Sequence, residues 1–92
     1  KVKQIIIKTG QAPSYQFHYK REETWIITQG TGLLTLDGNN SSVSKGDVIK
    51  VPVGVKHRIR NTGADDLVFI EVQLGDYFGE DDIVRVEDDY DR

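Results

Sequence analysis

Two histidines, a glutamate and a glutamine are spaced so that a β-sheet could bring them to one point. In residues 14–20 (SYQFHYK), Gln16 and His18 occupy alternate positions, so an extended strand presents both on one face. Glu23 and His57 begin the same alternation in two later segments. Two imidazoles, a carboxylate and an amide oxygen suit a borderline cation such as Zn²⁺, Mn²⁺, Fe²⁺ or Co²⁺, whereas Ca²⁺ and Mg²⁺ favour more oxygen ligands. The sequence therefore predicts a metal site on Gln16, His18, Glu23 and His57.

The same residues also have an interpretation without metal. The chain has 2 histidines, and each, taken singly, could be a surface residue or a hydrogen-bonded core residue. Gln16 and Glu23 could be exposed residues of edge strands. Alternation by itself leaves both interpretations open.

Short extended segments separated by turns must position these side chains. The segments are rich in β-branched and aromatic residues, and Gly, Pro, Asn or Asp bound them, with no sustained helical period. Short strands of this kind are typical of an antiparallel sandwich or barrel, so we expect an all-β fold. The expected strands are residues 2–8, 14–20, 24–30, 32–38, 47–53, 57–63 and 67–74.

The length and charge of the chain narrow its function. Its 92 residues suffice for one small domain, and no linker or repeat divides them. There is no cysteine, which excludes disulfides and thiolate metal sites. Residues 80–92 carry seven acids and two bases, so the remainder has a net charge of +2 although the whole chain has −3. A slightly basic body suits a small anionic metabolite, and it lacks the dense basic surface that nucleic acid requires.

The sequence also predicts the surroundings of the protein. No stretch approaches the roughly 20 apolar residues that span a bilayer, and the first residues lack an apolar run of signal-peptide length. We therefore expect a cytoplasmic protein with no membrane partner. A small β domain has exposed sheet edges, and the apolar segment 1–8 would pair readily with another chain, which predicts a homodimer.

The candidate ligands belong to two longer patterns of fixed spacing. The first pattern consists of Gly10, Gln16, His18, Glu23 and Gly30, and the second of Gly46, Pro52, Gly54, His57 and Asn61. These patterns resemble the two sequence motifs of the cupin family, with Gln16 where many cupins carry a first histidine. The resemblance implies a small antiparallel double-stranded β-helix, the cupin jelly-roll barrel, over about residues 3–74 of a single domain 1–92.

Three longer strings sharpen the resemblance. Residues 15–32 (YQFHYKREETWIITQGTG), 51–63 (VPVGVKHRIRNTG) and 67–90 (LVFIEVQLGDYFGEDDIVRVEDDY) resemble the cupin domain of type II phosphomannose isomerases, whose zinc is held by Gln, His, Glu and His. The resemblance implies an isomerase that interconverts mannose 6-phosphate and fructose 6-phosphate and uses one divalent ion. Zinc is the first candidate for this ion, and manganese, iron, cobalt or nickel are alternatives. It also implies that the acidic tail, residues 75–92, folds near the site.

The chain departs from the family at three positions. Tyr19, Lys20 and Thr24 stand where the family usually carries histidines. If one of those histidines assists proton transfer, this chain must use another group. Type II enzymes also carry an amino-terminal sugar nucleotidyltransferase domain, and its Gly-rich nucleotide loop is absent from these 92 residues. We therefore do not expect guanylyltransferase activity.

Aldose–ketose isomerisation moves a proton between C1 and C2 through an enediol, so it needs an acid/base group and a cationic phosphate clamp. Lys20, on the face of His18 in an extended strand, is a candidate for acid/base or phosphate duty. Arg21, expected at the barrel mouth, and Arg85, the single base within the acidic string, are candidates for catalysis and phosphate binding. Trp25 is expected in the core.

Two other functions stay open. One is a metal-containing cupin that binds a sugar phosphate or another anionic metabolite without converting it, which the missing histidines favour. The other is an Fe²⁺-dependent oxygenase, against which Gln16 and the isomerase-like tail argue.

Overall fold

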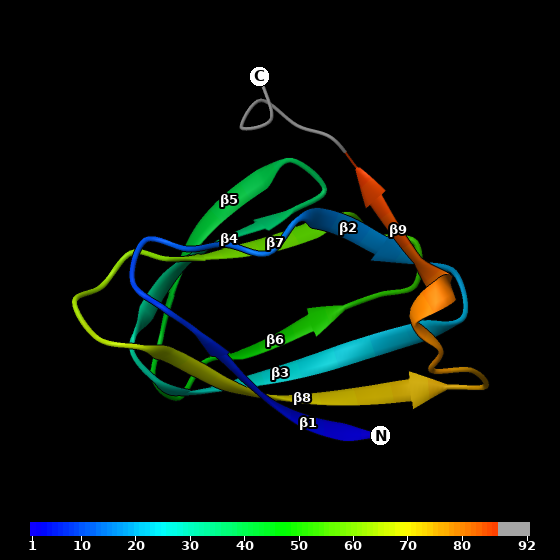
Figure 1. Cartoon of the computed structure of the whole chain (residues 1–92), viewed down its shortest axis with the longest axis horizontal. Helices are drawn as coiled ribbons and strands as arrows, with labels where there is room; N and C mark the ends of the chain where they lie inside the picture. The colour runs from blue at the N-terminus through cyan, green and yellow to red at the C-terminus, as the bar shows by residue number, and fades with distance from the viewer. Residues whose placement is uncertain (87–92) are drawn as a thin grey trace.

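Two antiparallel β-sheets face each other and enclose the interior of the domain (Figure 1). This computed structural model describes residues 1–86. The four-stranded sheet has the order β1-β8-β3-β6 and consists of β1 (Val2–Ile7), β8 (Leu67–Gly75), β3 (Arg21–Gln29) and β6 (Val48–Val51). The five-stranded sheet has the order β5-β4-β7-β2-β9 and consists of β5 (Asn39–Ser44), β4 (Thr31–Leu36), β7 (His57–Asn61), β2 (Tyr15–His18) and β9 (Ile83–Val86).

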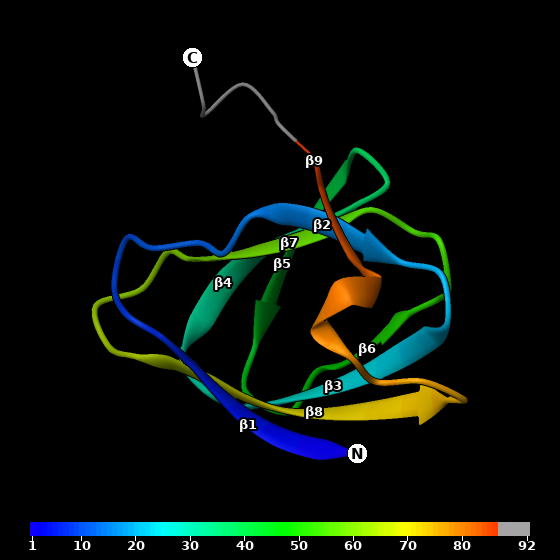
Figure 2. The same cartoon turned by 45° about the vertical axis from the view of Figure 1, so that its right-hand side comes forward.

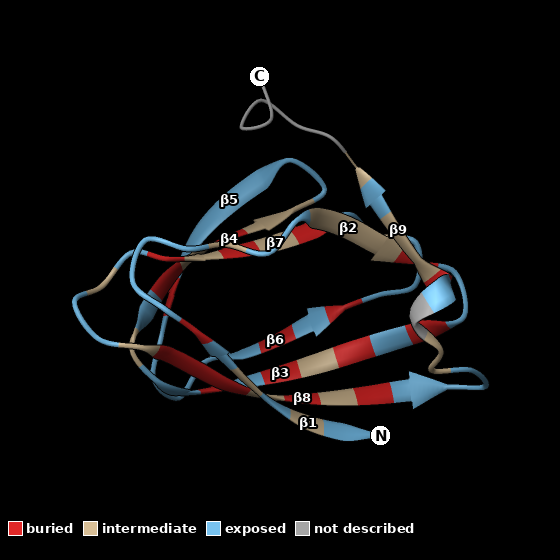
Figure 3. Cartoon of the chain, viewed as in Figure 1, coloured by how far each residue is buried: buried red, intermediate tan, exposed pale blue. Residues whose placement is uncertain are grey.

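Each central strand alternates between an inward and an outward face. Figure 3 shows buried bands alternating with exposed or intermediate ones along β3, and with intermediate ones along β8. Successive side chains of a strand point to opposite faces, so every second residue enters the space between the sheets. In β3 the buried residues are Arg21, Glu23, Trp25 and Ile27, and in β7 they are His57, Ile59 and Asn61.

The inward faces change from apolar to polar along the strands. On β8 the inward residues are Phe69, then Glu71, then Gln73. The apolar part is one cluster from both sheets, and full burial of each aliphatic side chain contributes about 1.5–3 kcal/mol. The cluster consists of Ile7, Trp25, Ile27, Leu34, Val43, Ile49, Val51, Ile59, Leu67 and Phe69. The core therefore holds one end of the barrel together, while the other end presents polar groups.

The expected all-β fold is confirmed, with two differences in its elements. Residues 39–44 form β5, although they lie between the expected strands 32–38 and 47–53. Antiparallel pairing with all of β4 supplies the ladder that the polar sequence did not predict. Residues 83–86, expected within the tail, form β9 and pair with β2. Residues 87–92 of the expected tail lie outside the described residues. Within residues 1–86, no helix has the length and apolar content to cross a bilayer.

The segment after β8 connects the two sheets. It leaves the four-stranded sheet at Gly75, passes through the short 3₁₀ turn η1 (Glu80–Asp82) and enters the five-stranded sheet as β9 (Figure 2). Gly75 has φ 155° and lies opposite Arg21 in the ladder, where a Cβ atom would come within 2.4 Å of the Lys20 carbonyl oxygen. Glycine is therefore required where this segment departs.

Candidate metal centre

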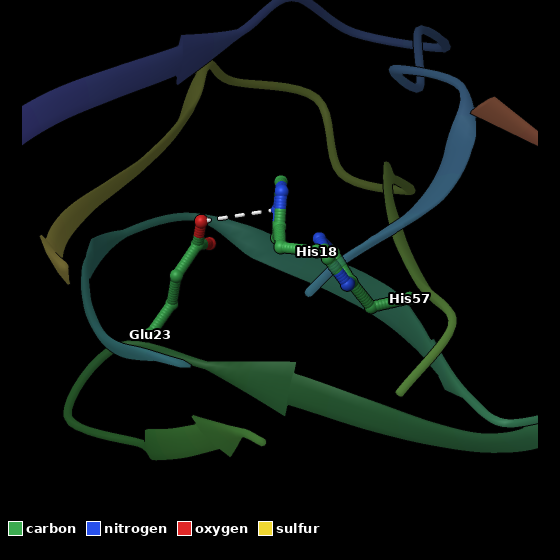
Figure 4. A group of neighbouring side chains, drawn as sticks. All are labelled: His18, Glu23 and His57. Carbon is green, nitrogen blue, oxygen red and sulfur yellow. Dashed lines mark ion pairs between the residues drawn. The ribbon is translucent and has the colours of Figure 1, made fainter. Parts of the chain in front are cut away.

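Three of the four predicted ligands come together between the sheets. His18, Glu23 and His57 are buried, with 4%, 2% and 4% of their surface exposed. Each offers a ligand atom, and these atoms lie within 4.8 Å of one another (Figure 4). The two imidazole centroids are 5.1 Å apart. Two metal–ligand bonds of about 2.1 Å each nearly span the separation of the ligand atoms, which is at most 4.8 Å, so one ion could contact all three side chains.

A turn between β6 and β7 positions both imidazoles. His18 ends β2, His57 begins β7, and the two strands are neighbours in the five-stranded sheet. Gly54 has φ 77°, a conformation that favours glycine, and its amide donates to the His18 carbonyl at 2.7 Å. The Val55 carbonyl lies 3.1 Å from Nδ1 of His57. The Pro-x-Gly turn, which belongs to the second predicted motif, is thus hydrogen-bonded to His18, which belongs to the first.

Glu23 reaches the site from the opposite sheet and is held by several donors. Arg21 Nε donates to its Oε2 at 2.9 Å, Trp25 Nε1 donates to its Oε1 at 2.9 Å, and His18 Nε2 lies 3.2 Å from Oε2. Burial alone would raise the pKa of Glu23, but hydrogen bonds with His18, Glu71 and Trp25 outweigh it and lower the pKa far below its ordinary value. Glu23 is therefore a carboxylate, the form that binds metal.

The surroundings of the imidazoles fit a divalent ion. A carbonyl can only accept, so His57 Nδ1 carries the proton and Nε2 keeps a lone pair. Burial lowers the pKa of His57, which favours the neutral imidazole that metals require. His18 Nδ1 is buried and has no hydrogen-bond partner within residues 1–86, a condition for which a bound ion is one ordinary explanation. The residues present thus fit a metal held by two nitrogens and one carboxylate oxygen.

Gln16, the fourth predicted ligand, lies beside these three residues. It pairs directly with His57 across β2 and β7, so both side chains share one face of the sheet. Gln16 is half-buried and lines the same cavity, while its Nε2 donates to the Ser14 carbonyl at 3.3 Å. The opposite partner of Gln16 is Arg85 on β9, which is exposed. Arg85 therefore lies in the row of Gln16 and His57, at its outer end.

The structure places two predicted catalytic residues differently from the sequence analysis. Lys20 is exposed, and its Nζ lies 4.9 Å from the Tyr77 ring centroid. It does not follow His18 on the inward face, because β2 ends at His18 and Asp82 accepts the amides of Tyr19 and Lys20 at 3.2 and 2.9 Å. Arg21 is not at the mouth; it is buried with 4% exposed.

Arg21 connects Glu23 with the segment that follows β8. Besides its bond to Glu23, its Nη1 donates to the Phe78 carbonyl at 3.4 Å. Alternation within β3 places Arg21 on the same inward face as Glu23 and Trp25. The alternation of Arg21 with Glu23 and Trp25 is visible in the sequence. The expected strand, however, began at residue 24 and so left Arg21 outside it.

Two buried polar residues beside Glu23 had no role predicted from the sequence: Glu71 could have faced the cavity or a partner subunit, and no orientation was predicted for Gln73. Gln73 Nε2 donates to Glu71 Oε2 at 2.7 Å, and both residues lie on the inward face of β8. Burial, together with the negative charge of Glu23, raises the pKa of Glu71. Alternation from Phe69 would have found both. Trp25, by contrast, lies in the core as expected, with 3% of its surface exposed.

One cavity contains the metal centre and continues toward the edge of the four-stranded sheet. Its walls combine the polar groups already described with apolar side chains from both sheets, among them Ile5, Phe69 and Ile83. Lys3 and Ser14 lie on its border. A buried donor set that opens onto a partly apolar cavity is the arrangement of a small-molecule site.

The fold and this donor set define a cupin-type domain, a double-stranded β-helix with a candidate metal centre between its sheets. A protein from Klebsiella pneumoniae with a double-stranded β-helix domain matches the chain with a TM-score of 0.82 at 20% identity, covering 95% of this chain and 70% of that one. The capsular polysaccharide assembling protein CapF from Staphylococcus aureus matches with a TM-score of 0.83 at 26% identity, covering 95% and 28%.

The chain belongs to the family described as mannose-6-phosphate isomerase C-terminal, which matches residues 1–88. The expected resemblance is therefore confirmed. Among curated relatives, mannose-1-phosphate guanylyltransferase from Salmonella montevideo is 46% identical over 91 residues, which are 99% of this chain and 19% of the relative. The chain thus spans about a fifth of the length of the curated relatives it matches.

The expectation that guanylyltransferase activity is absent is wrong. The relative from Salmonella montevideo is named for that activity, and relatives from Escherichia coli and Klebsiella pneumoniae carry the same name. The expectation depended on a missing nucleotide loop, but 92 residues that match 19% of a relative do not report on the rest of it.

Proposed function

We propose that this cupin domain interconverts mannose 6-phosphate and fructose 6-phosphate with the help of one divalent ion. Zinc is the first candidate for this ion, and the proposed ligands are Gln16, His18, Glu23 and His57. The observation that carries the proposal is the buried cluster of His18, Glu23 and His57, which opens onto a cavity in a chain of the mannose-6-phosphate isomerase C-terminal family. Manganese, iron, cobalt or nickel would suit the same donors.

The metal, when bound, would polarise the sugar carbonyl and stabilise the negative charge that develops on its oxygen. The chain's own groups prepare the site for that chemistry. Arg21 and Trp25 fix the Glu23 carboxylate, and the Val55 carbonyl fixes the His57 tautomer. Ile5, Phe69 and Ile83 give the cavity apolar walls that limit water around the reacting carbons.

The phosphate must meet positive charge at some distance from the reacting carbons. Arg85 remains a proposed phosphate ligand, since it lies in the row of Gln16 at the exposed edge. Arg21 remains proposed for binding anionic oxygens, since it is one of the residues that line the cavity. The position of Lys20 over Tyr77 does not support an acid/base role for it, and it is proposed only as a peripheral cation.

The names of the relatives extend the proposal to the whole protein. We infer that a longer protein containing this chain, like the relative of which the chain matches 19%, also transfers a guanylyl group to mannose 1-phosphate. In that arrangement the isomerase makes mannose 6-phosphate, and a separate phosphomutase reaction must convert it to the mannose 1-phosphate that the second activity uses. The homodimer and the cytoplasmic location also remain proposals, and a solution mass at micromolar concentration tests the first.

A coupled assay tests the isomerase directly. Zinc-loaded protein should convert fructose 6-phosphate to mannose 6-phosphate, a chelator should abolish conversion, and added zinc should restore it. His57→Ala should stay inactive after zinc is added, because one imidazole is missing. Metal-replete protein that converts neither sugar phosphate contradicts the proposal. Calorimetric binding without conversion would then favour the non-catalytic cupin, and iron-dependent oxygen uptake would favour the oxygenase.

A further inference from the structure

Lys3 borders the cavity of the metal centre from the edge strand of the four-stranded sheet. Residues alternate along β1, so Lys3 shares its face with Ile5 and Ile7, and Ile7 is buried in the core. Lys3 itself is half-buried. Its ammonium group therefore belongs to the interior side of the sheet, although it stands at the sheet's edge.

The strand register connects Lys3 to the metal centre. Lys3 pairs with Glu71 on β8, and Glu71 pairs with Trp25 on β3, so the three side chains form one inward row. Trp25 in turn donates to Glu23. Two strand spacings separate the Cα atoms of Lys3 and Trp25, which is roughly 10 Å. This is the scale of a phosphorylated hexose whose carbonyl end lies at Glu23.

Lys3 and Arg21 lie on the four-stranded sheet, and Arg58 lies on the five-stranded sheet. Arg21 is anchored beside the metal ligands by Glu23 and Phe78, where it would meet the reacting end of a sugar. The Arg58 guanidinium lies 5.3 Å from the Tyr15 ring centroid, on the five-stranded sheet. Lys3 supplies positive charge at the edge of the four-stranded sheet, two strands from Arg21 and opposite the sheet that carries the imidazoles. A lysine ammonium binds phosphate as a compact point charge.

We propose that Lys3 binds the phosphate group of the substrate and makes the site selective for phosphorylated over unphosphorylated hexoses. The inference rests on the proposed isomerase function and identifies the group that recognises the far end of its substrate. Lys3 acts on binding and not on the proton transfer, because it lies on the sheet opposite His18 and His57, and two strands away from Glu23 on its own sheet.

Kinetics and phosphate binding of the zinc-loaded protein test the assignment. Loss of a charged hydrogen bond to phosphate should raise KM for fructose 6-phosphate at least about tenfold in Lys3→Met, with kcat changed less than about threefold. The dissociation constant of inorganic phosphate, measured by calorimetry, should rise by a similar factor. Lys3→Arg should keep most of the affinity. Lys50→Met is the matched control, because Lys50 is exposed on the outer face of β6 and should leave both constants unchanged.

The outcomes separate this inference from the proposed function. If the wild type converts the sugar phosphates, and Lys3→Met has the same KM and the same phosphate affinity as the wild type, the inference fails while the function stands. If the wild type converts neither sugar phosphate, but Lys3→Met binds inorganic phosphate more weakly than the wild type does, the function fails and the phosphate site stands. Zinc content and unfolding temperature are measured beside each variant. If Lys3→Met and Lys3→Gln both lose zinc or unfold, Lys3 is structural and the inference is overturned.

Discussion

Breaking the ion pair of Arg21 and Glu23 should destabilise the protein far more than breaking the pair of Lys8 and Asp66, although the two have nearly equal lengths. Arg21 Nε lies 2.9 Å from Glu23 Oε2, and Lys8 Nζ lies 3.0 Å from Asp66 Oδ2. The Arg21 and Glu23 side chains are 4% and 1% exposed, whereas those of Lys8 and Asp66 are 67% and 37% exposed. Burial is therefore the variable that the comparison isolates.

The magnitudes follow from what each substitution leaves behind. Arg21→Met keeps an apolar stem but leaves the Glu23 carboxylate buried without its cation, which costs about 3–5 kcal/mol. Lys8→Met removes a pair that water screens, which costs about 0–1 kcal/mol. A chain of this length has a total stability of about 5–14 kcal/mol, so the first variant should lose a large part of it.

Urea unfolding of the metal-free protein, followed by fluorescence of the single Trp25, measures both costs. The cost of Arg21→Met should shrink when zinc is bound, because the ion supplies positive charge next to Glu23. Arg21→Lys should recover part of the loss. Equal costs for Arg21→Met and Lys8→Met, or an Arg21→Met cost that zinc does not reduce, would refute this account of the site's electrostatics.

Three further predictions concern the ligands and their neighbours. Gln16→Ala should weaken zinc binding without abolishing it, because three stronger ligands remain, whereas Gln16→His should bind zinc at least as tightly as the wild type. Competition with a chromogenic chelator measures both zinc affinities. An unchanged affinity in Gln16→Ala removes this residue from the ligand set. Because the pKa of Glu71 is raised from 4.5, its contribution to stability is present below about pH 4.5 and is lost as the pH rises through the folded-state value. Metal-free Glu71→Gln should therefore gain stability relative to the wild type between about pH 4.5 and 8, and a difference that does not vary with pH contradicts the raised pKa. Saturating zinc, at about a thousand times its dissociation constant, should raise the unfolding temperature by roughly 15–30 °C, and no shift means that the folded state binds no zinc.

Strand alternation predicted the inward residues wherever the strand boundaries were correct. Glu23 and Trp25 share a face because β3 is regular through both of them. The same rule failed for Lys20, because β2 ends two residues earlier and Asp82 turns the chain away. The position of an alternating side chain depends on where its strand ends, and a contact 62 residues away in sequence decides that end here.

Long-range pairing explains the other differences. The polar sequence of residues 39–44 has little strand preference, and its ladder with β4 determines its structure. Arg21 was expected at the mouth because it directly follows the predicted strand 14–20. Its burial depends on Glu23 and on the Phe78 carbonyl, and the latter comes from the segment that follows β8. Local sequence does not contain that information.

Diffraction from zinc-loaded crystals, recorded at the zinc absorption edge, tests the central claim most directly. The account predicts one anomalous peak per chain, within bonding distance of an imidazole nitrogen of His18, one of His57 and a carboxylate oxygen of Glu23. A map with no peak between these three side chains, or with its only peak on the acidic outer surface, would contradict it.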